Sequence, residues 1–360
     1  MRYIGSLILS ILIVFITVSG RYSLASDSAK EPVVPQNLLK LIHAPEVLEE
    51  LGLKSNDEKL LAILREIDGP WWRSRNLPED KQHVIIGDLE KKLLESLKTV
   101  LTDDKIKRLR EIEVQSQGTR ALIRSGIAKT VGLEGKQSQE ILRTFSQTDD
   151  VARKLSAKKG VDLALEKELT SARESEKNKL NELLTNQQQM SLGKLFGKPF
   201  DTMKLKRIFP LAPELIDSGE WAGASPTTFD EQRGKVVILH FYAFQCHNCV
   251  ANFHHYNRWH DTLSNKGVSV IGIQTPETSA ERDSTQVRKS AKDRGFRFPV
   301  LIDLKSKNWD AWGNTMWPTV YVIDKNGYIR SWWQGELNWQ GATGDQTIET
   351  LVDKLLAETY

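Results

Sequence analysis

The sequence predicts an all-α region followed by an α/β domain whose central mixed sheet is flanked by helices. Tryptophan is unevenly distributed, since two of the ten tryptophans lie in residues 35–205 and the other eight lie beyond residue 210. The first stretch is rich in Leu, Lys, Glu and Gln, whereas the second holds β-branched runs that favour strands. Pro199, Pro210 and Pro213 place the boundary near residues 200–220, because proline interrupts a helix.

The first residues are typical of an export signal. Met1-Arg2 gives a short basic start, residues 3–20 are almost wholly apolar, and Ser23-Leu24-Ala25 supplies small residues at a cleavage site. We expect residues 1–25 to be a signal peptide, or a membrane anchor, since the apolar stretch approaches the length of a span. Residues 26–34 follow as a linker. The remaining chain is expected to be exported, either periplasmic or anchored to the membrane and facing the periplasm or exterior.

Residues 35–205 are predicted to be a helical region of unknown function. Apolar residues recur at helical spacing over 84–97, Thr102 is expected to cap a helix over 105–114, and a longer pattern runs over 148–195. A short phrase recurs, most clearly as Leu184-Thr-Asn-Gln-Gln188. This phrase weakly resembles the Leu-Thr-x-x-Gln helical repeats of some exported stress-response proteins. A helical spacer or oligomerisation unit is favoured over a chaperone-like surface.

Residues 206–233 are predicted to be a linker that leads into the α/β domain, which occupies residues 234–360. The expected elements are strands over 234–242, 267–273 and 298–302, helices over 246–262, 284–294 and 345–358, and a hairpin over 317–333 with its turn at 325–327. Strand–helix–strand followed by a hairpin and a helix is a thioredoxin-like order.

Cys246 and Cys249 are the only cysteines of the chain, and they lie between the first predicted strand of this domain and the helix that follows. A thiolate at a helix N-terminus is stabilised by free N–H groups, and a thiol beyond two intervening residues is within reach to form a disulfide. A bridge across so short a loop constrains the unfolded chain little, which disfavours a purely stabilising disulfide. The pair therefore predicts thiol–disulfide exchange.

The residues around the pair resemble a known family. Residues 220–358 are similar to the TlpA/ResA type of exported, AhpC/TSA-like thioredoxin-fold protein, and closer still to the periplasmic domain of DipZ-type proteins. The matching motifs are Gly234-Lys-Val-Val, Phe241-Tyr-Ala243, Cys246-His-Asn-Cys249, Gly272-Ile-Gln-Thr-Pro-Glu277, Phe298-Pro-Val300, Trp312-Gly-Asn314, Trp317-Pro318, Ile323-Asp324 and Gly335-Glu336. The resemblance implies a thiol–disulfide oxidoreductase that needs no cofactor, acts on protein thiols and disulfides, draws on an upstream thiol donor, and works more as a reductant.

The resemblance also implies roles for individual residues. Cys246 would attack, or be attacked, to form the mixed disulfide with a partner, and Cys249 would resolve it, so that a Cys246–Cys249 disulfide is the oxidised form. Pro318 matches the cis-proline that faces the disulfide in thioredoxin-like folds. Trp317 beside it would line the substrate groove.

Five of the seven histidines lie near the cysteines, namely His240, His247, His254, His255 and His260. His240 matches the strand position of a buried acid that transfers protons in thioredoxins, and both that role and a core histidine remain open. His247 is expected to tune the thiolate. Two thiolates with imidazole could hold copper or zinc, which makes a metal chaperone an alternative, although helical geometry prevents all these rings from facing the cysteines. We predict no metal.

Other activities are disfavoured. A peroxiredoxin-type peroxidase needs Thr or Ser three residues before its cysteine and Pro seven before, where this chain has Ala243 and Leu239. The formal net charge of +3 gives no reason to expect nucleic acid as a partner. A helical binding or scaffold protein with a redox-inactive thioredoxin module is a further alternative, which the intact cysteine pair disfavours.

Overall fold

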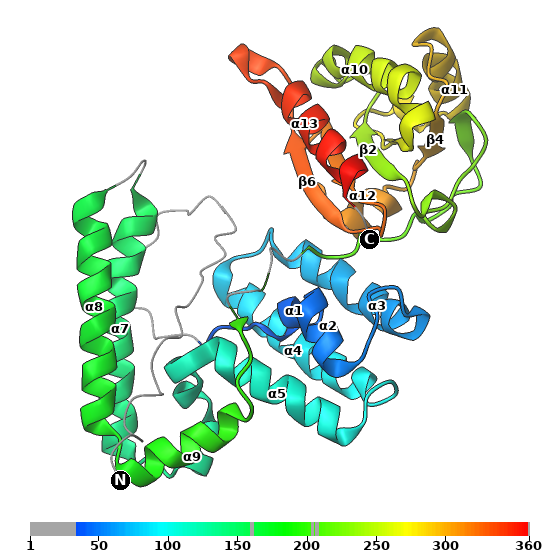
Figure 1. Cartoon of the computed structure of the whole chain (residues 1–360). Coiled ribbons are helices and arrows are strands. Elements are labelled where there is room, and N and C mark those ends of the chain that lie inside the picture. Colours follow the sequence, from blue (N-terminus) through cyan, green and yellow to red (C-terminus); the bar gives the residue numbers. More distant parts are fainter. Residues whose placement is uncertain (1–33, 159–161, 203–204, 206–208, 359–360) are drawn as a thin grey trace. The chain divides into compact units, whose positions relative to one another are not determined.

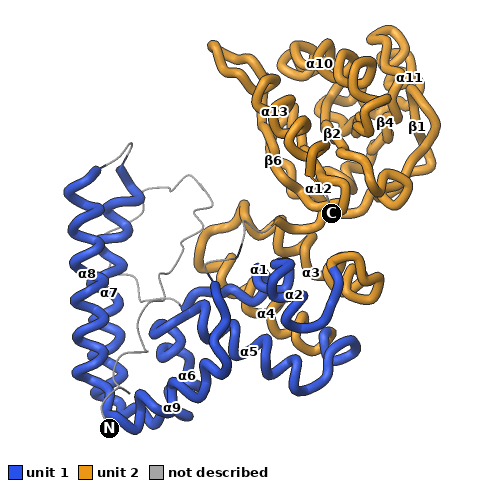
Figure 2. Tube along the Cα trace, viewed as in Figure 1, with its two compact units in different colours: residues 1–54, 97–208 blue, residues 55–96, 209–360 orange. Residues whose placement is uncertain are grey.

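The computed structural model describes residues 34–158, 162–202, 205 and 209–358. The predicted signal or anchor and most of the linker after it lie outside these residues. The chain divides into two compact units, one of residues 1–54 and 97–208 and the other of residues 55–96 and 209–360 (Figure 2). None of the described helices combines the length and the apolar run that a membrane span requires.

The described residues of the first unit form helices and connecting segments, in agreement with the all-α region that the sequence predicts. Its helices are α1 (Leu38–Leu41), α2 (Pro45–Leu51), α5 (Asp103–Gln117), α6 (Ser125–Val131), α7 (Gly135–Ala157), α8 (Leu163–Leu183) and α9 (Asn186–Phe196). Thr102 is the N-cap residue of α5, although its side chain makes no capping hydrogen bond. The single pattern expected over 148–195 is divided among α7, α8 and α9, and α7 and α8 pack side by side (Figure 1).

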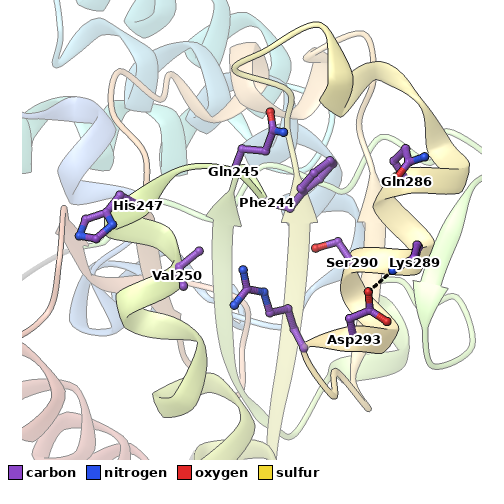
Figure 3. A pocket seen from close by; sticks show the side chains of 9 residues that line it. Phe244, Gln245, His247, Val250, Gln286, Lys289, Ser290 and Asp293 are labelled. Carbon is purple, nitrogen blue, oxygen red and sulfur yellow. Dashed lines mark hydrogen bonds and ion pairs between the residues drawn. The ribbon is translucent and has the colours of Figure 1, made fainter.

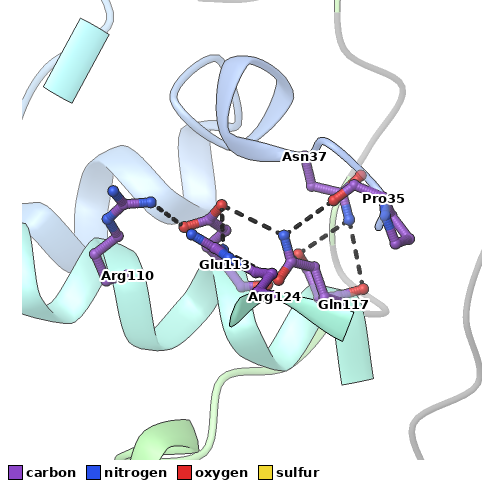
Figure 4. A network of polar contacts seen from close by, with 7 residues as sticks. Pro35, Asn37, Arg110, Glu113, Gln117 and Arg124 are labelled. Carbon is purple, nitrogen blue, oxygen red and sulfur yellow. Dashed lines mark hydrogen bonds and ion pairs between the residues drawn. The ribbon is translucent and has the colours of Figure 1, made fainter. Parts of the chain in front are cut away.

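A buried carboxylate joins several segments of this unit. Glu113 is almost fully buried and accepts hydrogen bonds from Arg110 Nη1 at 2.7 Å and Arg124 Nη1 at 2.9 Å (Figure 4). Gln117 Nε2 reaches both Glu113 Oε1, at 3.3 Å, and the carbonyl of Pro35, at 2.9 Å. Because each buried polar group has partners, the network fixes where the N-terminal segment lies against α5.

The second unit combines a helical pair with a six-stranded mixed sheet. The pair is α3 (Glu58–Ser74) and α4 (Glu79–Leu97), of which the last residue falls in the first unit. The strands are β1 (Trp221–Gly223), β2 (Val236–Tyr242), β3 (Val268–Gln274), β4 (Pro299–Ile302), β5 (Thr319–Ile323) and β6 (Ile329–Gln334). The remaining helices are α10 (His247–Leu263), α11 (Ser284–Asp293), α12 (Lys307–Trp312) and α13 (Gly344–Ala357).

The sheet has the order β1-β4-β3-β2-β5-β6. Strand β2 is parallel to β3, which is parallel to β4, while β5 and β6 add antiparallel neighbours beyond β2. Each strand and helix expected from the sequence in this domain is present. Strand β1 and helix α12 were not expected, because three and six residues give too little periodicity to detect.

Both faces of the sheet are covered, which explains why β2 is buried along its whole length. On one face Ile238 and Tyr242 pack with residues of α10, α11 and α13. On the other face Leu239 and Phe241 pack with Trp312 of α12 and with Trp72 of α3. Residues 55–96, which the sequence analysis placed in the helical region, therefore contribute to the core of the sheet.

Candidate active site

The cysteine pair lies where β2 passes into α10. Cys246 is the N-cap residue of α10, and its carbonyl accepts the N–H groups of Cys249 and Val250, both at 3.1 Å. This turn places Cys249 inside the helix, fully buried, while Cys246 stays partly exposed. Only one of the two sulfur atoms is therefore open to a partner.

The two thiols are also electrostatically different. A hydrogen bond from the Cys249 thiol, helped by the N–H groups of Cys249 and Asn248, lowers the pKa of Cys246 to about 7, against the opposing effect of partial burial. Burial is the main cause that raises the pKa of Cys249 far above its ordinary value. Cys246 is thus the thiolate near neutral pH, and Cys249 is the protonated thiol that stabilises it.

Trp317 and Pro318 lie where β5 begins, and the peptide bond between them is cis, as the resemblance implies. The indole of Trp317 stacks on that of Trp309 with 4.0 Å between ring centroids, and its Nε1 donates to the carbonyl of Thr275 at 3.2 Å. The carbonyl of Pro318 accepts the N–H of Gly335 at 2.8 Å. Trp317 and Cys246 both pack against the core cluster that includes Cys249.

A residue that the sequence analysis missed supports the turn before Cys246. Glu281 is fully buried, and its carboxylate accepts the backbone N–H groups of Gln245 at 2.7 Å, Glu277 at 2.8 Å and Thr278 at 2.9 Å. The Thr278 hydroxyl also donates to Gln245 Oε1 at 2.6 Å. The loop after β3 is thereby tied to the residue adjoining Cys246. An acidic residue soon after a strand end gives no distinctive sequence signal, so only the fold reveals it.

His240 is not brought into contact with the cysteines. Its ring is fully buried, stacks on Tyr256 with 3.8 Å between centroids, and is bordered by Phe298. Burial lowers the pKa of His240 to about 3, and neither ring nitrogen has a hydrogen-bond partner among the described residues. The surroundings are those of a core histidine, and the proton-transfer role stays a prediction.

His247 is exposed at the first residue of α10 and borders a groove between the start of α10 and α11 (Figure 3). Phe244 and Val250 form the apolar part of this groove, and Lys289, Ser290 and Arg294 line it from the α11 side. Gln245 and His247, the neighbours of Cys246 in the chain, both line this groove. A partner approaching Cys246 from this side would meet these residues.

The other histidines point to different places. His254 and His255 lie against each other, His255 Nδ1 is 3.8 Å from Asp345 Oδ2, and His260 contacts Ser264. Within the described part of the chain, no group of three His, Cys, Asp or Glu side chains is arranged to hold a metal ion.

Comparison with known proteins agrees with this site. Residues 214–332 match the AhpC/TSA family. Protein DipZ of Mycobacterium tuberculosis is 34% identical over 149 residues, which are 40% of this chain and 20% of that protein. Thiol-disulfide oxidoreductase YkuV of Bacillus subtilis is 26% identical over 157 residues, covering 44% of this chain and 99% of the relative.

A third relative, thiol-disulfide oxidoreductase ResA of Geobacillus thermodenitrificans, is 29% identical over 100 residues, covering 28% of this chain and 55% of ResA. The chain spans only about a fifth of the length of the DipZ proteins it matches. The α/β domain of this chain is thus similar to AhpC/TSA proteins of the TlpA/ResA type, and two of the relatives that match it are named thiol–disulfide oxidoreductases.

Proposed function

We propose that this chain is an exported thiol–disulfide oxidoreductase that reduces disulfides of protein partners through Cys246 and Cys249. The observation that carries the proposal is the asymmetry of the pair: an accessible thiol with a pKa lowered to about 7 lies next to a buried thiol that stays protonated. Thiol–disulfide exchange needs these two properties in the attacking and resolving thiols.

The chemistry follows from this arrangement. The Cys246 thiolate attacks a partner disulfide, forming a mixed disulfide and releasing one partner sulfur as a thiolate that takes up a proton. Cys249 then loses its proton and attacks the sulfur of Cys246, which releases the second partner sulfur. Two electrons pass to the partner, and the protein is left with a Cys246–Cys249 disulfide. A dithiol of an upstream donor restores the reduced form by the reverse exchange.

The modest lowering of the pKa of Cys246 supports the reducing direction. Thioredoxin, a reductant, has an attacking cysteine with a pKa near 7, whereas the strong oxidant DsbA has one near 3.5 because its reduced form is strongly stabilised. The pKa of Cys246, about 7, matches that of the thioredoxin cysteine. The TlpA/ResA resemblance favours the same direction. Export is proposed from the signal-like residues 1–25, and it places the pair in a compartment where disulfides form.

The test is disulfide exchange with insulin as the protein substrate and dithiothreitol as the donor. The wild-type protein should accelerate insulin reduction, Cys246→Ser should abolish the acceleration, and Cys249→Ser should accumulate mixed disulfides on Cys246. A wild-type protein without exchange activity, together with a Cys249→Ser variant that traps nothing, would refute the proposal. A reduction potential well above that of thioredoxin, about −270 mV, would contradict the reducing direction alone.

A further inference from the structure

We propose that the C-terminal turn of α3 positions Trp317, the residue expected to line the substrate groove, acting through α12 and Trp309. The inference rests on the proposed function, because it concerns how a protein substrate is received beside Cys246. The segment that supplies these contacts, residues 55–96, belongs to the same compact unit as the sheet.

The first step is the contact between α3 and α12. A short helix ends with carbonyl groups that have no partner within the helix. Here Trp72 Nε1 donates to the carbonyl of Trp312 at 3.0 Å, and Asn76 Nδ2 donates to that of Gly313 at 2.7 Å. Arg75 Nη2 donates to both carbonyls, at 3.2 and 3.1 Å, so that a cation lies at the C-terminal end of α12.

The contact is closely fitted. The Arg75 guanidinium lies over the Trp72 ring, 3.9 Å from its centroid, which holds the charged fork in place. Gly313 has a φ of 60°, and a Cβ at this position would lie 3.3 Å from both Arg75 Nη1 and Asn76 Nδ2. Only glycine allows the donors to approach the end of the helix this closely.

The second step leads from α12 to Trp317. The carboxylate of Asp303 accepts the N–H groups of Lys307, Asn308 and Trp309 at 2.9, 2.8 and 3.2 Å, so both ends of this six-residue helix are held. Trp309 of this helix stacks on Trp317 at 4.0 Å, and Trp317 directly precedes cis-Pro318. The position of α12 therefore sets the position of the indole pair.

The test uses three variants that weaken the α3–α12 contact to different degrees. Trp72→Phe and Asn76→Ala each remove one donor and leave most of the packing, and Arg75→Ala removes the cation. Lys92→Ala on α4 is the matched control, because Lys92 pairs with Glu66, at 2.8 Å, on the same helical hairpin. We expect KM for insulin to rise roughly three- to tenfold in Arg75→Ala, the effect of losing one or two hydrogen bonds.

Two further readouts separate the positioning role from a general loss of stability. The stacked indoles Trp309 and Trp317 couple excitonically, and the resulting circular dichroism couplet should weaken in Arg75→Ala and vanish in a Trp309→Phe reference. The rate at which dithiothreitol reduces the oxidised variants should equal that of the wild type, since the cysteines are untouched. The inference would be overturned if the three variants Arg75→Ala, Asn76→Ala and Trp72→Phe fold and leave both the KM for insulin and the couplet unchanged. If the wild type itself fails to reduce insulin, the proposed function fails, and the couplet alone decides the positioning role.

Discussion

At the scale of single residues, the hydrogen bond between the two thiols has a measurable consequence. Because the Cys249 thiol is the largest cause of the lowered pKa of Cys246, Cys249→Ala should raise that pKa from about 7 toward the ordinary value of about 8.5. The thiolate forms as pH rises, so alkylation of Cys246 by iodoacetamide should have its midpoint at a higher pH in this variant. Cys249→Ser keeps a hydroxyl donor and should lie in between. An unchanged midpoint in Cys249→Ala would contradict the assigned cause.

Glu281 and Glu277 belong to the same loop but have separable effects. Glu281→Ala leaves three backbone donors without their acceptor and should lower the free energy of unfolding by about 2 kcal/mol or more. Glu277 is exposed, and its negative charge raises the pKa of Cys246. Glu277→Gln should therefore leave stability unchanged and shift the alkylation midpoint of Cys246 to lower pH. Urea unfolding and the alkylation profile distinguish the two variants. If Glu281→Ala and Glu277→Gln changed stability and the alkylation midpoint equally, the two residues would not have separate effects.

At the scale of elements, the Leu-Thr-x-x-Gln phrase acquires a physical meaning. Thr185 is the N-cap residue of α9, and Thr185 and Gln188 form a reciprocal capping box, with hydrogen bonds of 3.3 and 3.0 Å. Gln137, at the matching position of α7, accepts the N–H of Glu134 at 3.2 Å. The amides of Gln137 and Gln188 also bond to each other, at 2.8 and 2.9 Å, so the first turns of α7 and α9 meet in space.

This pairing predicts that Gln188 stabilises the helical unit. Gln188→Ala should lower its free energy of unfolding by about 1–2 kcal/mol, since a capping bond and a buried amide pair are both lost. Gln187→Ala is the control, because Gln187 is exposed on the same turn. Helicity followed in urea measures both variants. A Gln188→Ala variant as stable as the control would show that the phrase marks the cap without stabilising it.

At the scale of the whole molecule, the sequence boundaries and the compact units differ in an instructive way. Composition separates residues 35–205 from the rest, because α3 and α4 are Leu-rich helices like their neighbours. The structure groups residues 55–96 with the sheet, since Trp72 is buried among Trp312, Tyr321 and other residues of its core. Trp72 is one of only two tryptophans in residues 35–205. A single aromatic residue that packs into the core of a sheet far away in the sequence leaves no periodic pattern from which this contact could be predicted.

The strands and helices of the thioredoxin-like domain were predictable because each has a complete local pattern. Strand β2 is an apolar run interrupted only by His240, and α10, which begins between the two cysteines, carries its buried residues at helical spacing. The site was predictable to the same extent, since the cysteines, Trp317 and Pro318 lie within quoted motifs. Glu281, Arg75 and Asn76 were not predictable, because their partners are backbone groups far away in the sequence or in an unrelated loop.

The sequence by itself determined the class of chemistry: two cysteines with two residues between them, placed at the start of a helix after a buried strand. It also determined the fold of the surrounding domain, because local patterns decide where strands and helices form. Only the tertiary structure decided how far each thiol is buried and which side chain holds the turn before Cys246. Burial and pKa depend on groups that are close in space, and the order of residues along the chain does not show which groups these are.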